Sequence, residues 1–301
     1  ATHTARECLA GMTVINLYDY FQGIDRKQIS RKALRHAPEN REWSIQPVRE
    51  THDNRVYADK RCIMYVANEP DSGNLRHINY FVSRKKTRRD RFDTAGFLSC
   101  TEYLDAATGL PLMTIYYRQN RSPAIIEYFS ITENKNQLPA IHILDQDGFV
   151  TQAFTTREEC IACFLAAITH GRKSVLLIDR RDGYLKFLEK ARNAEEYKNL
   201  SILTMIHSNH TRPPYTSYSD TRRYYHCIFD GQHRFDGIIV ATEKQKHDIM
   251  TRYGISNVHA IPHAIAYDGN SPAAACEPHK VIFVGSLTAE KNPEAALDAF
   301  T

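Results

Sequence analysis

The last third of the chain decides the fold, and it reads RFDGIIVATEKQKHDIMTRYG at residues 234–254, NVHAIPHAIA at 257–266 and KVIFVGSLTAEKNPEAALDAF at 280–300. Residues 237–241 form a short continuous apolar run, which is typical of a strand covered on both faces, as in parallel sheets. Thr242 followed by Glu243 favours a helix, because a hydroxyl cap and an acidic first turn stabilise a helix N-terminus. Gly254 closes this helix after Tyr253. The stretch therefore predicts one βα unit.

Two more strands are expected in the same stretch. Residues 258–262 form a second apolar strand, and the polar segment 266–278 follows it. That segment carries Gly269, Asn270 and two prolines, which is the composition of a linker. Beyond it, residues 280–284 predict a third buried strand.

The third strand leads to a candidate phosphate site. It runs into Gly285, a loop that holds Lys291, and an expected helix at 293–300. A helix N-terminus after a glycine turn presents backbone N–H groups and a partial positive charge, and Lys291 adds a full charge. The alternative is that Glu290 and Lys291 are ordinary residues of a surface loop.

Composition limits the class of protein. A length of 301 residues indicates two or more domains, and 42% hydrophobic with 25% charged residues is typical of soluble globular proteins. We see no signal peptide and no apolar run near the roughly 20 residues that cross a bilayer. Seven scattered cysteines fit a reducing cytoplasm better than a disulfide framework. The net charge of +4 permits an anionic partner without requiring one.

Both ends of the sequence are expected to be cut. Residues 1–12 have the pattern of a helix tail that enters an apolar strand at 13–17, and the chain stops at Thr301 inside or just after a helix. A further Rossmann-like domain cannot be built from about twenty residues, so we expect a fragment with residues missing at both ends. The aromatic run 16–25 is interpreted either as a functional loop or as packing between domains.

The middle of the chain has a different pattern of apolar and polar residues. Between residues 43 and 151, short alternating runs are separated by turn signals. The clearest runs are 61–66, 77–82, 112–117, 124–130 and 140–144. They predict an antiparallel meander, which makes this region an all-β insertion within an α/β chain.

The insertion carries a cluster of positive charge. Its members are Arg84, Lys85, Lys86, Arg88, Arg89 and Arg91, with only Asp90 among them. Such a cluster would attract a polyanion, for which a polyol-phosphate polymer is a candidate. The alternative is a solvated loop between two strands. Nucleic acid is disfavoured, because no nucleic-acid-binding module surrounds the cluster.

The α/β pattern returns after the insertion. The expected elements are a helix at 157–170, a strand at 174–178, a charged helix at 183–196, a strand at 200–206 and a helix at 221–229. Cys160 and Cys163 share one face of the first helix, where core packing is favoured over a redox or zinc pair. His207 and His210 follow the strand at 200–206. Ligands of open α/β sheets bind beyond the carboxyl ends of strands, so both histidines are candidate substrate contacts, with His210 preferred; a structural role for either stays open.

The runs TEKQKHDIMTRYG, IPHAI and VGSLTAEKNPEAALDAF resemble retaining glycosyltransferases of the GT4 type. This resemblance implies the GT-B fold, with two Rossmann-like domains. It implies that Gly285 and Lys291 line the phosphates of a nucleotide-sugar donor without a metal ion or other cofactor, and that His263 lies near the donor. One departure is Ser286, where the family often has an arginine; a serine donates a hydrogen bond but carries no charge.

A β insertion early in the first domain narrows the resemblance. It is similar to bacterial enzymes that α-glycosylate wall teichoic acid, and to the glycosyltransferase that modifies serine-rich adhesins in accessory secretion. In both, the β domain mediates oligomerisation or acceptor contact. The implied domains are a first Rossmann-like part at 1–42, the β domain at 43–152, the second Rossmann-like part at 153–266, a linker at 267–278 and the start of a donor domain at 279–301.

We therefore expect a cytoplasmic bacterial enzyme that moves glucose or N-acetylglucosamine from a UDP-sugar to teichoic acid with retention. A homo-oligomer, at most peripheral membrane association and no nucleic acid partner are expected. In this family a glutamate pair lies further into the second domain, which implies that the fragment alone is inactive. The alternatives are a transferase, or its non-catalytic partner, acting on a Ser/Thr-rich adhesin, and a polyanion-binding module built on the basic insertion.

Overall fold

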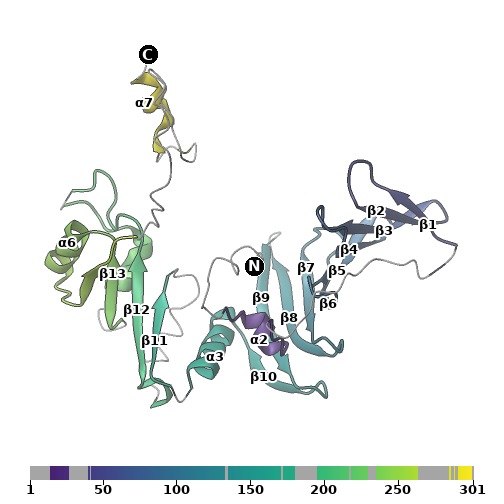
Figure 1. Cartoon of the computed structure of the whole chain (residues 1–301), viewed down its shortest axis with the longest axis horizontal. Helices are drawn as coiled ribbons and strands as arrows, with labels where there is room; N and C mark the ends of the chain where they lie inside the picture. Colours follow the sequence, from purple (N-terminus) through teal and green to yellow (C-terminus); the bar gives the residue numbers. More distant parts are fainter. Residues whose placement is uncertain are drawn as a thin grey trace, which may run out of the picture. The chain divides into compact units, whose positions relative to one another are not determined.

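Two sheets dominate the computed structural model, which is drawn in Figure 1. The residues described are 14–26, 40, 42–132, 135–170, 172–179, 195–216, 218–229, 235–263, 285, 288 and 291–299. One sheet has ten strands and the other has four. The chain divides into two compact units, Ala1–Ala260 and Ile261–Thr301, and both sheets belong to the first unit.

The ten-stranded sheet is an antiparallel meander, as predicted. Its strands lie in chain order, and each pairs with its neighbours along the sequence. They are β1 (Ser44–Pro47), β2 (Asn54–Ala58), β3 (Arg61–Asn68), β4 (Leu75–Val82), β5 (Lys85–Phe92), β6 (Leu98–Leu104), β7 (Pro111–Tyr117), β8 (Pro123–Thr132), β9 (Lys135–Leu144) and β10 (Val150–Phe154). The five runs singled out in the sequence all fall within these strands.

The basic cluster is not a loop, so the alternative interpretation of it as a solvated loop is wrong. Residues 85–91 belong to β5. Of the six basic residues, only Arg84 lies outside this strand, in the two-residue turn from β4. The turn puts Ser83 and Arg84 at φ values of 50° and 64°, the left-handed conformation that a tight hairpin requires. The high density of charge in the sequence favoured a loop. In the structure, Lys86, Arg88 and Asp90 are alternate residues of β5, and this strand pairs with β4 on one side and β6 on the other.

The four-stranded sheet is parallel, with the order β11 (Ser174–Ile178), β12 (Leu200–Ile206), β13 (Gly237–Val240) and β14 (Val258–Ala260). The predicted βα unit is confirmed in β13 and α6 (Glu243–Tyr253): the Thr242 side chain accepts from Gln245 N, and Gly254 ends the helix at φ 68°. Gly237 has a packing reason as well, because a Cβ there would lie 2.9 Å from Leu203 Cδ2.

Two helices connect the sheets. α3 (Arg157–Thr169) begins at the cap Thr156, as predicted, and contacts β9 and β10, while α2 (Leu17–Phe21) contacts β8 (Figure 1). Leu17 and Phe21 pack against hydrophobic clusters of both sheets, which favours the packing interpretation of this aromatic run. Cys160 is buried on α3, and burial raises the pKa of its thiol to about 12, as expected for a core cysteine.

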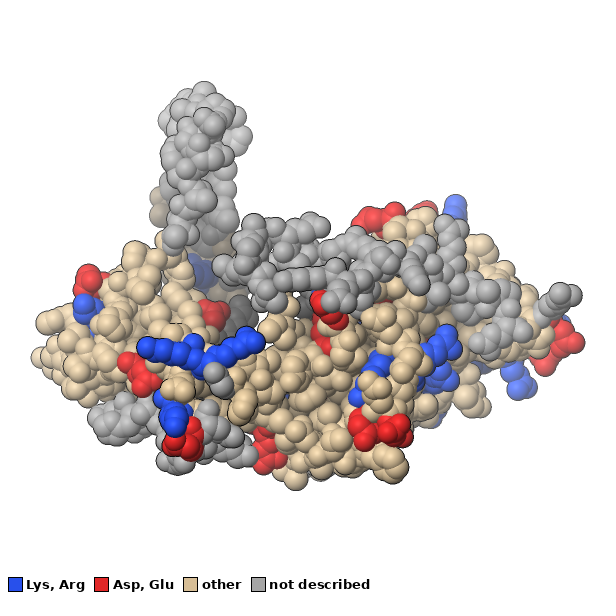
Figure 2. All heavy atoms as spheres, turned by 60° about the horizontal axis from the view of Figure 1, so that its bottom comes forward, with Lys and Arg blue, Asp and Glu red and all other residues tan. Residues whose placement is uncertain are grey.

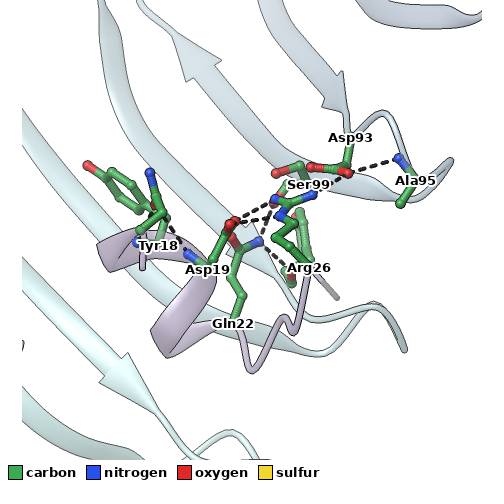
Figure 3. A network of polar contacts seen from close by, with 9 residues as sticks. Tyr18, Asp19, Gln22, Arg26, Asp93, Ala95 and Ser99 are labelled. Atoms are coloured by element: carbon green, nitrogen blue, oxygen red, sulfur yellow. Dashed lines mark hydrogen bonds and ion pairs between the residues drawn. The ribbon is translucent and has the colours of Figure 1, made fainter. Parts of the chain in front are cut away.

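Polar contacts fix α2 and its following turn on the ten-stranded sheet (Figure 3). Arg26 donates from Nε to Asp19 Oδ2 at 2.7 Å and from Nη1 to Asp93 Oδ1 at 2.6 Å. Gln22 Nε2 donates to the carbonyl oxygens of Ser99 and Tyr117. These bonds join the turn after α2 to the loop between β5 and β6 and to the sheet backbone.

A buried carboxylate adds a second link. Glu127 on β8 accepts from Tyr18 OH at 3.0 Å and Tyr116 OH at 3.3 Å, and its Oε1 lies 3.0 Å from Arg157 Nη2. The Glu127 side chain is only 3% exposed, so these three partners compensate a charge that is costly to bury. Burial raises the pKa of Tyr116 above its ordinary value, which keeps this hydroxyl a donor.

Two predicted elements differ from the structure. No strand forms over residues 14–17: Val14 and Ile15 are about half exposed, and Asn16 caps α2 instead, with its Oδ1 accepting from Tyr18 N at 2.8 Å. The helix predicted at 221–229 is replaced by a 3₁₀ turn, Arg223–Tyr225, followed by the short α5 (His226–Phe229). Thr221 forms a β-bridge with Thr211, which keeps the backbone extended where the helix would start.

Several predictions fall outside the described residues. These are the strand at 280–284, Ser286, the linker at 267–278 and the charged helix at 183–196 except for a 3₁₀ turn, Glu195–Tyr197. In the second unit the structure describes α7 (Pro293–Asp298), whose cap Asn292 accepts from Ala295 N. Within the described segments no helix is long and apolar enough to cross a membrane.

Candidate functional site

An imidazole and a carboxylate meet at the carboxyl ends of two parallel strands. His207 follows β12 and Asp179 follows β11, and the distance from His207 Nε2 to Asp179 Oδ1 is 2.6 Å. Both side chains are accessible, at 41% and 60% exposure. Polar groups in this position can bind a ligand above the sheet edge, and a carboxylate bound to one ring nitrogen fixes the orientation of the imidazole.

Asp179 was not among the candidate site residues inferred from the sequence. The sequence contained one indication of the pair: a titratable residue directly follows each of the two predicted strands, 174–178 and 200–206. Parallel pairing of Ile178 with Thr204 then brings the two ends together. The pairing of Asp179 with His207 depends on β11 and β12 being neighbours in the sheet, and this strand order cannot be read directly from the sequence.

His210 has the opposite environment. Its side chain is only 2% exposed, and its Nε2 lies 2.9 Å from Asp248 Oδ2 on α6. The ring packs edge-on against Phe229 and Tyr253, with centroids 5.8 Å and 6.2 Å away. Burial lowers the pKa of His210 and outweighs the opposing effect of Asp248. The preferred histidine of the sequence analysis therefore lies inside the fold, while His207 lies at its surface.

The segment between the two histidines is fixed by neighbouring elements. Gln245 on α6 donates to Ser208 O at 2.9 Å, and Ser208 Oγ lies 2.7 Å from Tyr225 OH. Asn209 Oδ1 accepts from the backbone and side chain of Thr211. These contacts fix the segment that joins the exposed His207 to the buried His210.

Half of the basic cluster is engaged within the sheet. Arg88 donates to both carboxylate oxygens of the buried Asp90 and lies over the Tyr80 ring at 4.6 Å. Arg89 and Arg91 both pair with Glu102 on β6, at 3.4 Å and 2.8 Å. Glu102 lies far from the cluster in sequence, so the sequence analysis did not count it against the positive charge.

The other basic residues are Arg84, Lys85 and Lys86. Within the described part of the chain no ion pair engages them, and Arg84 and Lys85 are exposed. Burial and the neighbouring Arg89 lower the pKa of Lys86. On the face drawn in Figure 2, lysine and arginine side chains lie in separate groups with aspartate and glutamate beside them.

The candidate donor residues lie in the second unit. His263, Gly285 and Lys291 are exposed, and Lys291 N donates to Thr288 O at 2.9 Å. Among the described residues of the whole chain, no group of three His, Cys, Asp or Glu residues could hold a metal ion.

Solved structures share this fold. The chain is similar to TarM from S. aureus, in a complex with fondaparinux, alpha-GlcNAc-glycerol and UDP, with a TM-score of 0.61, 16% identity and coverage of 87% of this chain and 51% of that one. It is similar to the Glycosylation Associate Protein (Gap123) complex from Streptococcus agalactiae, with a TM-score of 0.61, 16% identity and coverage of 86% and 48%. A GtfA/B complex matches with a TM-score of 0.57, 17% identity and coverage of 82% and 48%.

These likenesses confirm the resemblance inferred from the sequence at the level of the fold. The chain spans about half the length of the solved chains that it matches. No model of a known protein family matches the chain, and no curated protein matches it.

Proposed function

We propose that this chain belongs to a retaining GT4-like glycosyltransferase of GT-B architecture, which transfers glucose or N-acetylglucosamine from a UDP-sugar to a teichoic acid. The observation that carries the proposal is the exposed His207–Asp179 pair at the carboxyl edge of the parallel sheet, in a unit that also contains the ten-stranded sheet. That combination of sheets is shared with TarM, which was solved with UDP and alpha-GlcNAc-glycerol.

In the proposed donor site, one set of residues stabilises negative charge on the leaving UDP and another orients the donor sugar. Lys291, the Gly285 backbone and Ser286 would stabilise the negative charge that grows on the departing UDP, with His263 nearby and without a metal ion. His207 would accept a hydrogen bond from a sugar hydroxyl at Nδ1, because Asp179 accepts the Nε2 proton and so holds the imidazole in the tautomer whose Nδ1 is an acceptor. His210 would act as a positioning residue, because its buried ring packs against Phe229 and Tyr253 three residues after His207.

Other parts of the proposal concern the whole protein. We propose a cytoplasmic homo-oligomer that uses the β domain at 43–152 for assembly or acceptor contact. Arg84, Lys85 and Lys86 are then the basic residues best placed to meet an anionic acceptor, because Arg88 and Arg89 already pair with carboxylates of the sheet.

A second candidate is a protein that glycosylates a Ser/Thr-rich adhesin, or a non-catalytic partner of such an enzyme. Two observations favour it. Ser286 removes a charge where related donor sites often have arginine, and Gap123 and GtfA/B, which share the fold, were solved as complexes. Such a partner would hold the acceptor with the same fold and would not turn over the donor.

The test is a transfer assay with the full-length protein that contains this chain. UDP-glucose and UDP-N-acetylglucosamine would each be supplied with a ribitol-phosphate teichoic acid or a Ser-rich peptide, and released UDP and the anomeric configuration of the product would be measured. Retained configuration on teichoic acid is expected. Transfer to the peptide alone would favour the adhesin candidate, and the absence of transfer and donor hydrolysis in every combination would reject a transferase that acts alone.

A further inference from the structure

A cavity of about 520 Å³ lies within the first unit, and none of its lining residues carries a role in the donor or acceptor sites described above. Its walls come from the loop after His210 and from α5 and α6, and they include Arg212, Tyr218, Asp220, Thr221, His226 and Arg252. The volume is within the range of small-molecule sites in proteins.

The walls of the cavity are held by the fold. Arg212 N donates to Asp220 O at 2.7 Å, which closes the base of the loop beside the bridge between Thr211 and Thr221. Arg252 Nη1 donates to Ser219 O at 2.6 Å. Thr221 Oγ1 is hydrogen-bonded to Tyr253 OH on α6. A site whose walls are already ordered loses little conformational entropy when a ligand binds.

The lining combines positive charge with one acidic acceptor. Within the described residues, no carboxylate pairs with Arg212, and Arg252 makes its bond described above to a backbone carbonyl. Asp220 has no ion pair in the same part of the chain, so its carboxylate is an acceptor in the wall. Tyr218 is 95% exposed and adds an aromatic surface at the site.

This chemistry selects one class of ligand. Arginine binds phosphate oxygens through paired, charge-assisted hydrogen bonds. A ligand with phosphate alone would be repelled by Asp220, and a neutral glycan would offer no negative charge to Arg212. A sugar or polyol phosphate satisfies both, because its hydroxyls donate to the carboxylate and its phosphate accepts from the guanidinium groups.

We propose that the cavity binds a phosphodiester-linked polyol unit of an anionic polymer. The identity of the polymer as an acceptor rests on the proposed function. The cavity is then a second acceptor-binding region in addition to the Arg84–Lys86 segment, and it follows directly along the chain from His207 and His210.

The test measures binding without a donor sugar, so that it does not depend on catalysis. Isothermal titration calorimetry on the full-length protein would use a glycerol-phosphate teichoic acid fragment, with neutral dextran and inorganic polyphosphate as comparison ligands. Arg212→Gln should weaken teichoic acid binding by about tenfold, the loss of one charge-assisted contact. Arg172→Gln, which removes an exposed arginine from the loop between α3 and β11, is the matched control and should change binding less than twofold.

A second variant separates hydroxyl recognition from charge. Asp220→Asn should weaken binding of the hydroxyl-bearing teichoic acid, yet it should strengthen binding of polyphosphate, since it removes a negative charge and leaves the arginines. Thermal unfolding of each variant would exclude loss of the fold. Arg212 is exposed, and within the described segments its hydrogen bonds are backbone bonds that a glutamine keeps, so its variant should remain folded.

The proposal would be overturned if Arg212→Gln left teichoic acid binding unchanged, or if Arg172→Gln weakened it as much. Binding that depends on Arg212 in a protein that transfers no sugar would reject the proposed function and leave the cavity assignment standing. Transfer to teichoic acid that is unaffected by Arg212→Gln, together with unchanged binding, would reject the cavity assignment alone.

Discussion

The two histidines after β12 differ in what they can do, although they are three residues apart. His207 contacts Asp179 at an accessible strand end, whereas His210 is enclosed by Phe229, Tyr253 and Asp248. Both histidines were predicted as candidate substrate contacts, because of their residue type and their position just after a strand. Their burial could not be predicted, because it depends on α5 and α6, which pack over His210 from later in the chain.

The His207–Asp179 pair gives the first prediction. If the full-length protein is the proposed transferase, His207→Ala should lower the transfer rate by about 100-fold. Asp179→Asn should lower it by about tenfold, because the imidazole would keep its place but lose the partner that orients it. Initial rates at saturating UDP-sugar would be measured. His247→Ala, which removes an exposed imidazole from α6, is the control and should leave the rate unchanged. Equal rates for all three variants would remove His207 from the mechanism.

His210 gives a prediction about pH. Burial lowers the pKa of His210 below the ordinary 6.5, so the unfolded chain binds a proton at pH values where the folded imidazole stays neutral. Its contribution to stability is therefore complete above pH 6.5 and falls as the pH drops below that value. Urea unfolding at pH 7.5 and 5.5 should show wild type losing more stability than His210→Phe. Burial also lowers the pKa of His77, to about 4, but that residue is present in both proteins and its effect cancels.

At the scale of elements, tight turns in the ten-stranded sheet store conformational strain. The two-residue turn between β2 and β3 puts Asp59 and Lys60 at φ values of 47° and 62°. Aspartate tolerates the left-handed region, whereas lysine is strained there. Lys60→Gly should therefore stabilise the protein by about 0.5–1 kcal/mol.

The matched control for the turn is its neighbour. Arg61→Gly places glycine in β3, where it should destabilise the protein by about 0.5–1 kcal/mol through loss of backbone entropy. Thermal unfolding of both variants would show shifts of opposite sign. A loss of stability in both would mean that the turn does not strain Lys60.

Elements were predictable where their signals are local. Thr242 and Gly254 mark the ends of α6 in the sequence, and the alternating runs mark the meander, so both were correct. The helix predicted at 221–229 failed because Thr221 pairs with Thr211, a contact made across a loop. The basic strand β5 was not predicted from the sequence. Its arginines form ion pairs with Asp90 and with Glu102 on the next strand, and the pair with Glu102 becomes visible only once the sheet is formed.

At the scale of the whole molecule, the first unit depends on a junction between two sheets that are far apart in sequence. Leu17 and Phe21 of α2 contribute to the hydrophobic clusters of both sheets, and Arg157 of α3 reaches Glu127 of β8. Alternating and continuous apolar runs in the sequence predicted the two kinds of sheet. It did not predict this junction, because Tyr18, Glu127 and Arg157 carry no shared local motif.

The junction gives the last prediction. Glu127→Gln keeps the shape of the side chain but leaves Arg157 and Tyr18 without the charge that they contact, and it should lower the unfolding free energy by about 2 kcal/mol. Because α2 and α3 join the two sheets, calorimetry should also show the single unfolding transition of the unit broaden or split. Glu195→Gln removes an exposed ion pair with Lys198 and should cost less than about 0.5 kcal/mol. A transition that stays single with an unchanged midpoint would mean that apolar packing of Leu17 and Phe21, and not the buried carboxylate, couples the two sheets.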